Sequence, residues 1–324
     1  MTERPTGVLV MAHGTPATPE EIESFYTSIR RGRPPTPELL ADLVGRYRAI
    51  GGTSPLRRHT EDQVAGVAAT LETAAPGRFV VRYGAKHTQP SIEEGMAELA
   101  ELGVTRVVGL VLTPHQSAAG TGQYLERAAQ AASSMAPPIE LVPVPGWFRT
   151  PGFASILAQR VQESLASLPE PVRTNCEVIF TAHSVPSRVV PEGDPYPDEV
   201  TESAKEIAAR AGLGRWRVAW QSAGRTPDVW LGPALLDEIR AVAADGTAAV
   251  VVCPVGFVAD HLEVLFDLDV EAAAVAASVG IRFARTSSLN DDPRFLTVLA
   301  EAVLANAVGA EAAGSDQGSK RPAP

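Results

Sequence analysis

Six histidines are spread along the chain, and five of them follow an apolar run of β-branched residues within a few positions. In open α/β sheets, ligands bind outside the carboxyl ends of the strands. We therefore expect His13, His115 and His183 at the mouth of a sheet. An imidazole there can titrate near neutrality or ligate a metal ion, although a single histidine is more often a turn or core residue.

A row of carboxylates follows another apolar run. Glu263, Asp267 and Glu271 recur every four residues, a spacing that stacks them on one face of a helix. Like charges at this spacing cost stability unless a cation or solvent relieves them. Two interpretations stay open, namely a solvated acidic face and a path that guides hard cations toward a pocket.

Positive charge is concentrated near the start of a chain whose formal net charge is -10. Guanidinium groups bind carboxylates with two parallel hydrogen bonds, so this segment suits a small polycarboxylate ligand, and a solubilising surface is the alternative. Tyr47, Ser54 and Tyr124 add hydroxyl donors and aromatic faces. The arginines are Arg30, Arg31, Arg33, Arg46, Arg48, Arg57 and Arg58.

The elements that must position these side chains alternate in type along the chain. Short β-branched runs predict strands, and amphipathic segments rich in Ala and Glu predict helices, as in a parallel sheet covered by helices. The fold class is therefore α/β. Strands are predicted at 8–12, 79–83, 107–112, 178–182, 217–220 and 249–253, and helices at 20–30, 61–75, 198–211, 234–244 and 293–307.

An internal repeat divides the chain. The segment VLVMAHGTP at 8–16 recurs as VIFTAHSVP at 178–186, each an apolar strand that ends in Ala-His. Proline and glycine cluster between residues 143 and 152, which is typical of a boundary. We expect an N-terminal domain at 1–146, a C-terminal domain at 147–313, and a polar, disordered tail at 314–324.

Composition excludes several classes of protein. With 45% hydrophobic residues, 324 residues can bury two cores, and the acidic balance disfavours nucleic acid as a partner. No apolar stretch reaches the roughly 18 residues of a membrane span, and no signal core follows the polar start, so we expect a cytoplasmic protein. Cys176 and Cys253 lack any CxxC partner and are expected to be free thiols.

These features together suit the insertion of a divalent metal ion into a flat, carboxylated macrocycle. A histidine and a carboxylate on facing loops would handle the metal, the arginine segment would hold the carboxylates, and aromatic walls would cover the ring. No Walker loop, GxGxxG turn or GxSxG elbow is present.

The order of the motifs resembles that of the ferrochelatases over residues 7–307. The resemblance is greatest to the bacterial branch that inserts ferrous iron into coproporphyrin III. The motifs are MAHGTP at 11–16, RRGR at 30–33, RY at 46–47, GGTSP at 51–55, AHSVP at 182–186, GDPYP at 193–197, WQS at 220–222 and GFVADHLE at 256–263.

This resemblance implies a type II chelatase fold, in which two Rossmann-like domains, each with a parallel sheet flanked by helices, clamp the porphyrin. It implies that His183 and Glu263 handle the metal and the protons, and that Asp267 and Glu271 pass the metal inward. Residues matched to porphyrin binding are His13, Arg30, Arg46, Tyr47, Ser54 and Tyr124.

Two features depart from the pattern of the family. Close relatives carry tyrosine where this chain has His13, so the axial ligand of the product iron is an open question. The C-terminal tail has no cysteine for the [2Fe-2S] cluster of actinobacterial relatives, so we expect no cluster and no permanently bound cofactor, with Fe²⁺ only as substrate.

The resemblance further implies a monomer that makes transient contact with the next enzyme of haem synthesis. Three alternatives remain at this stage. They are a protoporphyrin IX ferrochelatase, a non-catalytic carrier of porphyrin or haem, and a chelatase for another tetrapyrrole such as cobalt sirohydrochlorin.

Overall fold

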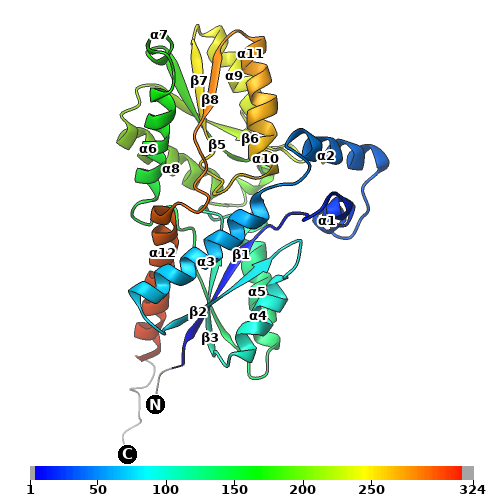
Figure 1. The fold of residues 1–324 in the computed structure, drawn as a ribbon, viewed down its shortest axis with the longest axis vertical. Helices are drawn as coiled ribbons and strands as arrows, with labels where there is room; N and C mark the ends of the chain where they lie inside the picture. The colour runs from blue at the N-terminus through cyan, green and yellow to red at the C-terminus, as the bar shows by residue number, and fades with distance from the viewer. Residues whose placement is uncertain (1–3, 316–324) are drawn as a thin grey trace, which may run out of the picture.

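Two parallel four-stranded sheets form the core of the computed structural model, which describes residues 4–315. The first sheet has the order β2-β1-β3-β4 and the second has the order β6-β5-β7-β8 (Figure 1). The predicted α/β class, with a parallel sheet in each half, is confirmed. The strands are β1 (Thr6–Ala12), β2 (Phe79–Ala85), β3 (Arg106–Val111), β4 (Glu140–Pro143), β5 (Cys176–His183), β6 (Trp216–Gln221), β7 (Ala249–Cys253) and β8 (Arg282–Arg285).

The internal repeat occupies equivalent places in the two sheets. β1 lies between β2 and β3, and β5 lies between β6 and β7. His13 follows β1 directly, and His183 is the last residue of β5. Each histidine is therefore at the carboxyl end of an inner strand, where parallel sheets place their ligands.

The alternation of side chains along β1 explains why helices cover both faces of the first sheet. Val8 and Val10 point into one hydrophobic cluster and Leu9 and Met11 into another, and all four are fully buried. A strand buried on both faces reads as a continuous apolar run, which is what the sequence shows. The first of these clusters also contains Phe180 of β5, so the two halves share a core.

The longer helices are as follows: α1 (Ile22–Ile29), α2 (Pro37–Ala49), α3 (Leu56–Ala74), α4 (Ile92–Glu101), α5 (Gln123–Ser134), α6 (Phe153–Ala166), α8 (Tyr196–Ala211), α9 (Leu235–Ala244) and α12 (Pro293–Ser315). Short helices are α7 (Glu170–Arg173), α10 (Leu262–Leu265) and α11 (Ala273–Ser278), and a π-helix, η4, spans Asp267–Ala272. A second π-helix, η2, spans Ala118–Gly122. The single-turn 3-10 helices are η1 (Pro19–Glu21) and η3 (Ser187–Val189).

The last helix returns to the first half of the molecule. α12 runs beside α3, and a Cβ at Gly66 of α3 would approach Leu296 of α12 to within 2.2 Å (Figure 1). The predicted division at 146/147 follows chain order and remains a prediction. Residues 293–307 come after this division in the chain, yet they pack against α3, which belongs to the first half. Of the predicted tail at 314–324, residues 314–315 belong to α12 and the remainder lies outside the described residues.

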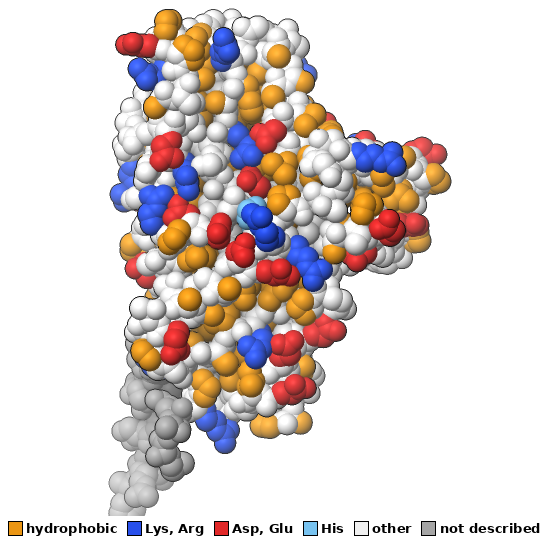
Figure 2. All heavy atoms as spheres, viewed as in Figure 1, with side chains coloured by type: hydrophobic (Ala, Val, Ile, Leu, Met, Phe, Trp, Pro, Cys, Tyr) orange, Lys and Arg blue, Asp and Glu red, His pale blue; other side chains and the backbone are white. Residues whose placement is uncertain are grey.

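Two helices extend away from the sheets. α1 and α2 project to one side at the level of α10, where the two halves meet (Figure 1). Acidic and basic side chains are interspersed over the visible face rather than separated into two fields (Figure 2). Within residues 4–315, no helix has the length and apolar character needed to cross a bilayer. Both cysteines are free, as expected.

Candidate active site

The centre of the site is an imidazole and a carboxylate from two elements of the second half. His183 Nε2, at the end of β5, lies 3.5 Å from Oε1 of Glu263 in α10. The other carboxylate oxygen, Oε2, lies 3.7 Å from Nε2 of His261, the residue before α10. Glu263 is thus held between two histidines, one at the end of β5 and one in the loop that follows β7.

In three histidines of the site, the ring nitrogen Nδ1 is hydrogen-bonded to a backbone carbonyl. Nδ1 lies near a carbonyl oxygen of Gly14 in His13, of Ser184 in His183 and of Ala259 in His261. A carbonyl oxygen can only accept, so Nδ1 carries a proton in each ring. Nε2 is therefore the nitrogen that each ring offers to a metal ion or a proton in transfer.

The charges of the central pair support each other. Burial alone would lower the pKa of His183, but the charge and hydrogen bond of Glu263, the Ser184 carbonyl and the charge of Asp267 raise it to about 9. Burial would raise the pKa of Glu263, yet His183 and His261 hold it well below its ordinary value. At neutral pH the pair is an imidazolium next to a carboxylate.

The first half contributes an uncharged histidine. Removal of the ring from water lowers the pKa of His13 to about 4, although the charge of Glu263 acts in the opposite direction. His13 packs against Phe25 of α1 and against His87, with ring centroids 5.7 and 4.7 Å apart. The first half thus supplies a neutral imidazole on which the charge of Glu263 from the second half acts.

The carboxylate row does not lie on one regular α-helix. α10 ends at Leu265 and the chain continues as the π-helix, in which the Glu271 N–H donates to the Phe266 carbonyl five residues back. Asp267 is buried, accepts a hydrogen bond from Ser222, and lies 3.5 Å from Nη1 of Arg46. Burial and the charge of Glu263 raise the pKa of Asp267 to about 6.

The predicted arginine segment reaches the site through α2. Arg46 bonds Asp42 on its own helix at 3.1 Å and stacks over Phe266 at 5.0 Å, and Asp42 pairs with Arg225 of the second half at 2.9 Å. Arg30 lies at the end of α1, over the ring of Tyr26 at 5.7 Å. Arg46 therefore links the arginine segment directly to the acidic row.

The hydroxyl-bearing residues line the same region but are more enclosed. Tyr47 is only 2% exposed, its hydroxyl lies 3.4 Å from that of Thr15, and burial raises its pKa to about 12. Ser54 is buried and accepts the Leu56 N–H at the start of α3. Tyr124 is buried under the ammonium of Lys86, which lies 4.8 Å above its ring.

One expectation about the histidines was wrong. His115 is fully buried, bonds Ser203 of α8 through Nε2 at 2.8 Å, and does not open onto the mouth of the sheet. It lies in the contact between the loop after β3 and α8, where Glu199 also accepts the Gln116 N–H. The loop turns inward against the second half, which strand-end reasoning from one sheet does not anticipate.

Several contributors were not identified from the sequence. His261 and Ser222 contact the carboxylates directly, and the hydroxyl of Tyr196 donates to the carbonyl of His183 at 3.1 Å. Lys86 and His87 line an open cavity of about 980 Å³ between α1 and α4. In the sequence, Lys86 and His87 are recognisable only as part of a polar segment after a predicted strand.

The donor set suits a transient metal ion better than a resident one. Among the described residues, no group of three or more His, Cys, Asp or Glu side chains is arranged to hold a metal. His183 and Glu263 could offer a metal ion an imidazole and a carboxylate, ligands that ferrous iron accepts.

Known proteins resemble this chain over most of its length. Residues 5–307 match the family described as Ferrochelatase. The coproporphyrin III ferrochelatase of Bacillus subtilis (strain 168) is 44% identical over 306 residues, which cover 94% of this chain and 98% of that protein. The ferrochelatase of Herpetosiphon aurantiacus is 41% identical, with 91% of this chain and 96% of that protein covered.

Among solved structures, SirB from Bacillus subtilis with Fe³⁺ has a TM-score of 0.60, with 95% of this chain and 98% of that chain covered. At 12% identity this likeness concerns the fold alone. The match to the family over nearly the whole chain shows that the protein is a metal chelatase. The chain belongs to the ferrochelatase family, whose substrates are ferrous iron and a porphyrin.

Proposed function

We propose that this chain inserts ferrous iron into coproporphyrin III, with His183 and Glu263 as the metal-handling and proton-handling pair. The observation that carries the proposal is the contact of 3.5 Å between His183 Nε2 and Glu263 Oε1, at the carboxyl end of β5. The names of several relatives support the choice of porphyrin, since those at 40–44% identity include coproporphyrin III ferrochelatases.

The pair can deliver metal and remove protons in a fixed order. In the resting protein the imidazolium of His183 balances Glu263. A ferrous ion that binds Glu263 replaces that positive charge, so His183 releases its proton to water and becomes a neutral base. As the metal leaves Glu263 and enters the ring, His183 can accept one of the two pyrrole protons and the freed Glu263 carboxylate the other.

The remaining residues have roles in binding the porphyrin and in the metal path. Arg30, Arg46, Tyr47, Ser54 and Tyr124 hold the propionates, and Asp267 and Glu271 lead the metal toward Glu263. His13 faces the iron of the product. Two observations support these roles. The guanidinium of Arg46 lies over the ring of Phe266. Burial and the charge of Glu263 raise the pKa values of Tyr47 and Tyr124, and the same charge opposes the lowering of the pKa of His13 by burial.

Steady-state assays with ferrous iron under anaerobic conditions distinguish the two porphyrins. We expect coproporphyrin III to have the higher kcat/KM because it carries four carboxylates for the arginine segment, against two in protoporphyrin IX. Equal kcat/KM values for the two would contradict the proposed preference. The Herpetosiphon relative is named only ferrochelatase, so protoporphyrin IX is the second candidate.

A further inference from the structure

A strained residue lies at the junction of the two halves, in the loop between β8 and α12. Asn290 has a φ of 45°, in the left-handed region, which asparagine enters more readily than other residues with a side chain but still seldom. Such a conformation persists only where the surrounding structure holds it, and it is often found where position matters for function.

Every polar group of Asn290 is used. Its N–H donates to the Val258 carbonyl at 2.9 Å, and its carbonyl accepts from Nε2 of Gln63 at 2.8 Å. Its Oδ1 accepts the Asp260 N–H at 2.9 Å, and its Nδ2 donates to Oδ2 of Asp260 at 3.1 Å. One residue therefore ties the loop before α10 to α3 of the first half.

The partner carboxylate is fully occupied as well. Oδ1 of Asp260 accepts a hydrogen bond from Ser288 at 2.7 Å and lies 3.2 Å from Nη2 of Arg285. With Asn290 on Oδ2, both oxygens are used, so Asp260 is not free to bind a metal although it precedes His261. The carboxylate of Asp260 therefore holds the surrounding loops together.

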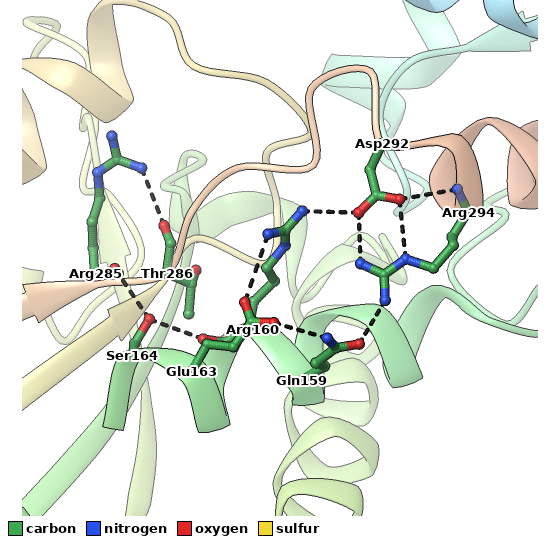
Figure 3. A network of polar contacts seen from close by, with 8 residues as sticks. All are labelled: Gln159, Arg160, Glu163, Ser164, Arg285, Thr286, Asp292 and Arg294. Atoms are coloured by element: carbon green, nitrogen blue, oxygen red, sulfur yellow. Dashed lines mark hydrogen bonds and ion pairs between the residues drawn. The ribbon is translucent and has the colours of Figure 1, made fainter. Parts of the chain in front are cut away.

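The loop that carries Asn290 is fixed at both ends to α6. At its start, the Arg285 carbonyl accepts from Ser164 at 3.3 Å, and at its end Asp292 bonds Arg160 at 2.8 Å and Arg294 at 2.7 Å (Figure 3). Gln159 completes this network by accepting from Arg294. The anchored ends explain how the strain at Asn290 is tolerated.

We propose that Asn290 is a positioning residue for iron insertion. By holding Asp260 to α3, it fixes the segment that carries His261 and Glu263, and so sets the contact between Glu263 and His183. The inference rests on the proposed role of that pair. A displacement of about 1 Å at reacting groups can cost on the order of 100-fold in rate, so two lost hydrogen bonds here should act on catalysis.

Two variants test this role. Asn290→Asp keeps the shape but sets a carboxylate against that of Asp260, and Asn290→Gly keeps both backbone contacts without strain while removing both side-chain contacts. We expect kcat for iron insertion to fall at least tenfold in each, with porphyrin affinity within about twofold of wild type. The double variant Asn290→Asp with Asp260→Asn restores a donor opposite an acceptor and should recover several-fold of the loss.

Asn175→Asp is the matched control. The side chain of Asn175 contacts Gly246 and Arg215 at the amino ends of the strands of the second sheet, at the opposite end from the site. It should leave kcat unchanged. Either wild-type kcat in both Asn290 variants, or equal losses of kcat in the control, would overturn the inference. His183→Ala is assayed in parallel. If His183→Ala retains full activity, the proposed role of the pair has failed. If His183→Ala is inactive while both Asn290 variants are fully active, only the inference about Asn290 has failed.

Discussion

His183 and Glu263 are near each other because β5 and β7 are parallel neighbours, so their carboxyl ends lie at the same end of one sheet. β5 places the imidazole, and the loop after β7 places the carboxylate, so neither depends on a local sequence motif for its partner. The pairing converts a histidine that would be neutral if merely buried into an imidazolium with a pKa of about 9. The resting charge of the site is thus set by one contact.

The raised pKa of His183 predicts a dependence of stability on pH. The pKa of His183 in the folded protein, about 9, exceeds the ordinary histidine pKa of about 6.5, so the pair contributes stability that is complete below pH 6.5 and is lost as pH rises through 9. We expect the difference in free energy of unfolding between wild type and His183→Gln to shrink over this range. Urea denaturation at a series of pH values measures it, and a constant difference would contradict the assignment.

His13 gives a prediction about the ligand of the product iron. Because its pKa is about 4, the ring stays neutral well below the ordinary range for histidine and its Nε2 can act as a ligand at pH 6. Absorption and resonance Raman spectra of the ferric product should show nitrogen ligation that persists to about pH 5 and a phenolate charge-transfer band in His13→Tyr. Identical spectra for wild type and His13→Ala would show that His13 is not the ligand.

At the scale of elements, α2 and the π-helix meet through Arg46 and Asp267. The sequence placed Arg46 with the propionates and Asp267 with the metal, and the structure pairs the two at 3.5 Å. The proposed binding of a propionate by Arg46 would compete with Asp267 for the guanidinium. The proposal therefore links substrate binding to the electrostatics of the acidic row.

Replacement of Arg46 should affect porphyrin binding specifically. We expect Arg46→Ala to weaken coproporphyrin binding by about 1.5–3 kcal/mol, the usual range for a lost charged hydrogen bond, and to make the remaining affinity less sensitive to salt. Arg48→Ala is the control, since Arg48 is exposed on the same helix. Fluorescence titration of the porphyrin measures both, and equal affinities would contradict a substrate contact.

The inner strands were predictable because they are buried on both faces and form continuous apolar runs, as at residues 8–12 and 249–253. β4 and β8 were missed because they are four residues long, lie at sheet edges and contain Pro143 or end in arginines. The helices α2, α4, α5 and α6 were also missed. In α2, Pro37 marks a loop in sequence, whereas Thr36 caps the helix and Pro37 begins it.

The same distinction applies to the site. His183, Glu263 and Asp267 could be singled out because each belongs to a recognisable motif or spacing. The placement of Glu263 between two imidazoles, and the contacts of Ser222 and Asn290, depend on segments far apart in sequence. No local pattern encodes these contacts, and only the assembled fold creates them.

At the scale of the whole molecule, α12 joins the halves into one cooperative structure. Phe295 and Leu299 of α12 are fully buried in the cluster that also holds Val10 of the first sheet and Phe180 of the second. A chain divided by sequence order would leave this surface exposed on the first half. Stability of the first sheet should therefore depend on residues near the end of the chain.

Phe295→Ala tests this dependence. Loss of a fully buried phenylalanine leaves a cavity and typically costs about 3–5 kcal/mol. We expect one shifted unfolding transition by calorimetry, because both halves share the core. Two separate transitions, of which only one moves, would instead indicate halves that unfold independently.

The central claim is that His183 and Glu263 insert iron while other residues bind the porphyrin. The most direct measurement compares wild type, His183→Ala and Glu263→Ala for anaerobic ferrous insertion into coproporphyrin III and, separately, for porphyrin affinity. We expect both variants to lose at least 100-fold in kcat, as is usual when a metal ligand or general base is removed, with porphyrin affinity nearly unchanged. Insertion rates within about threefold of wild type in both variants would contradict the account.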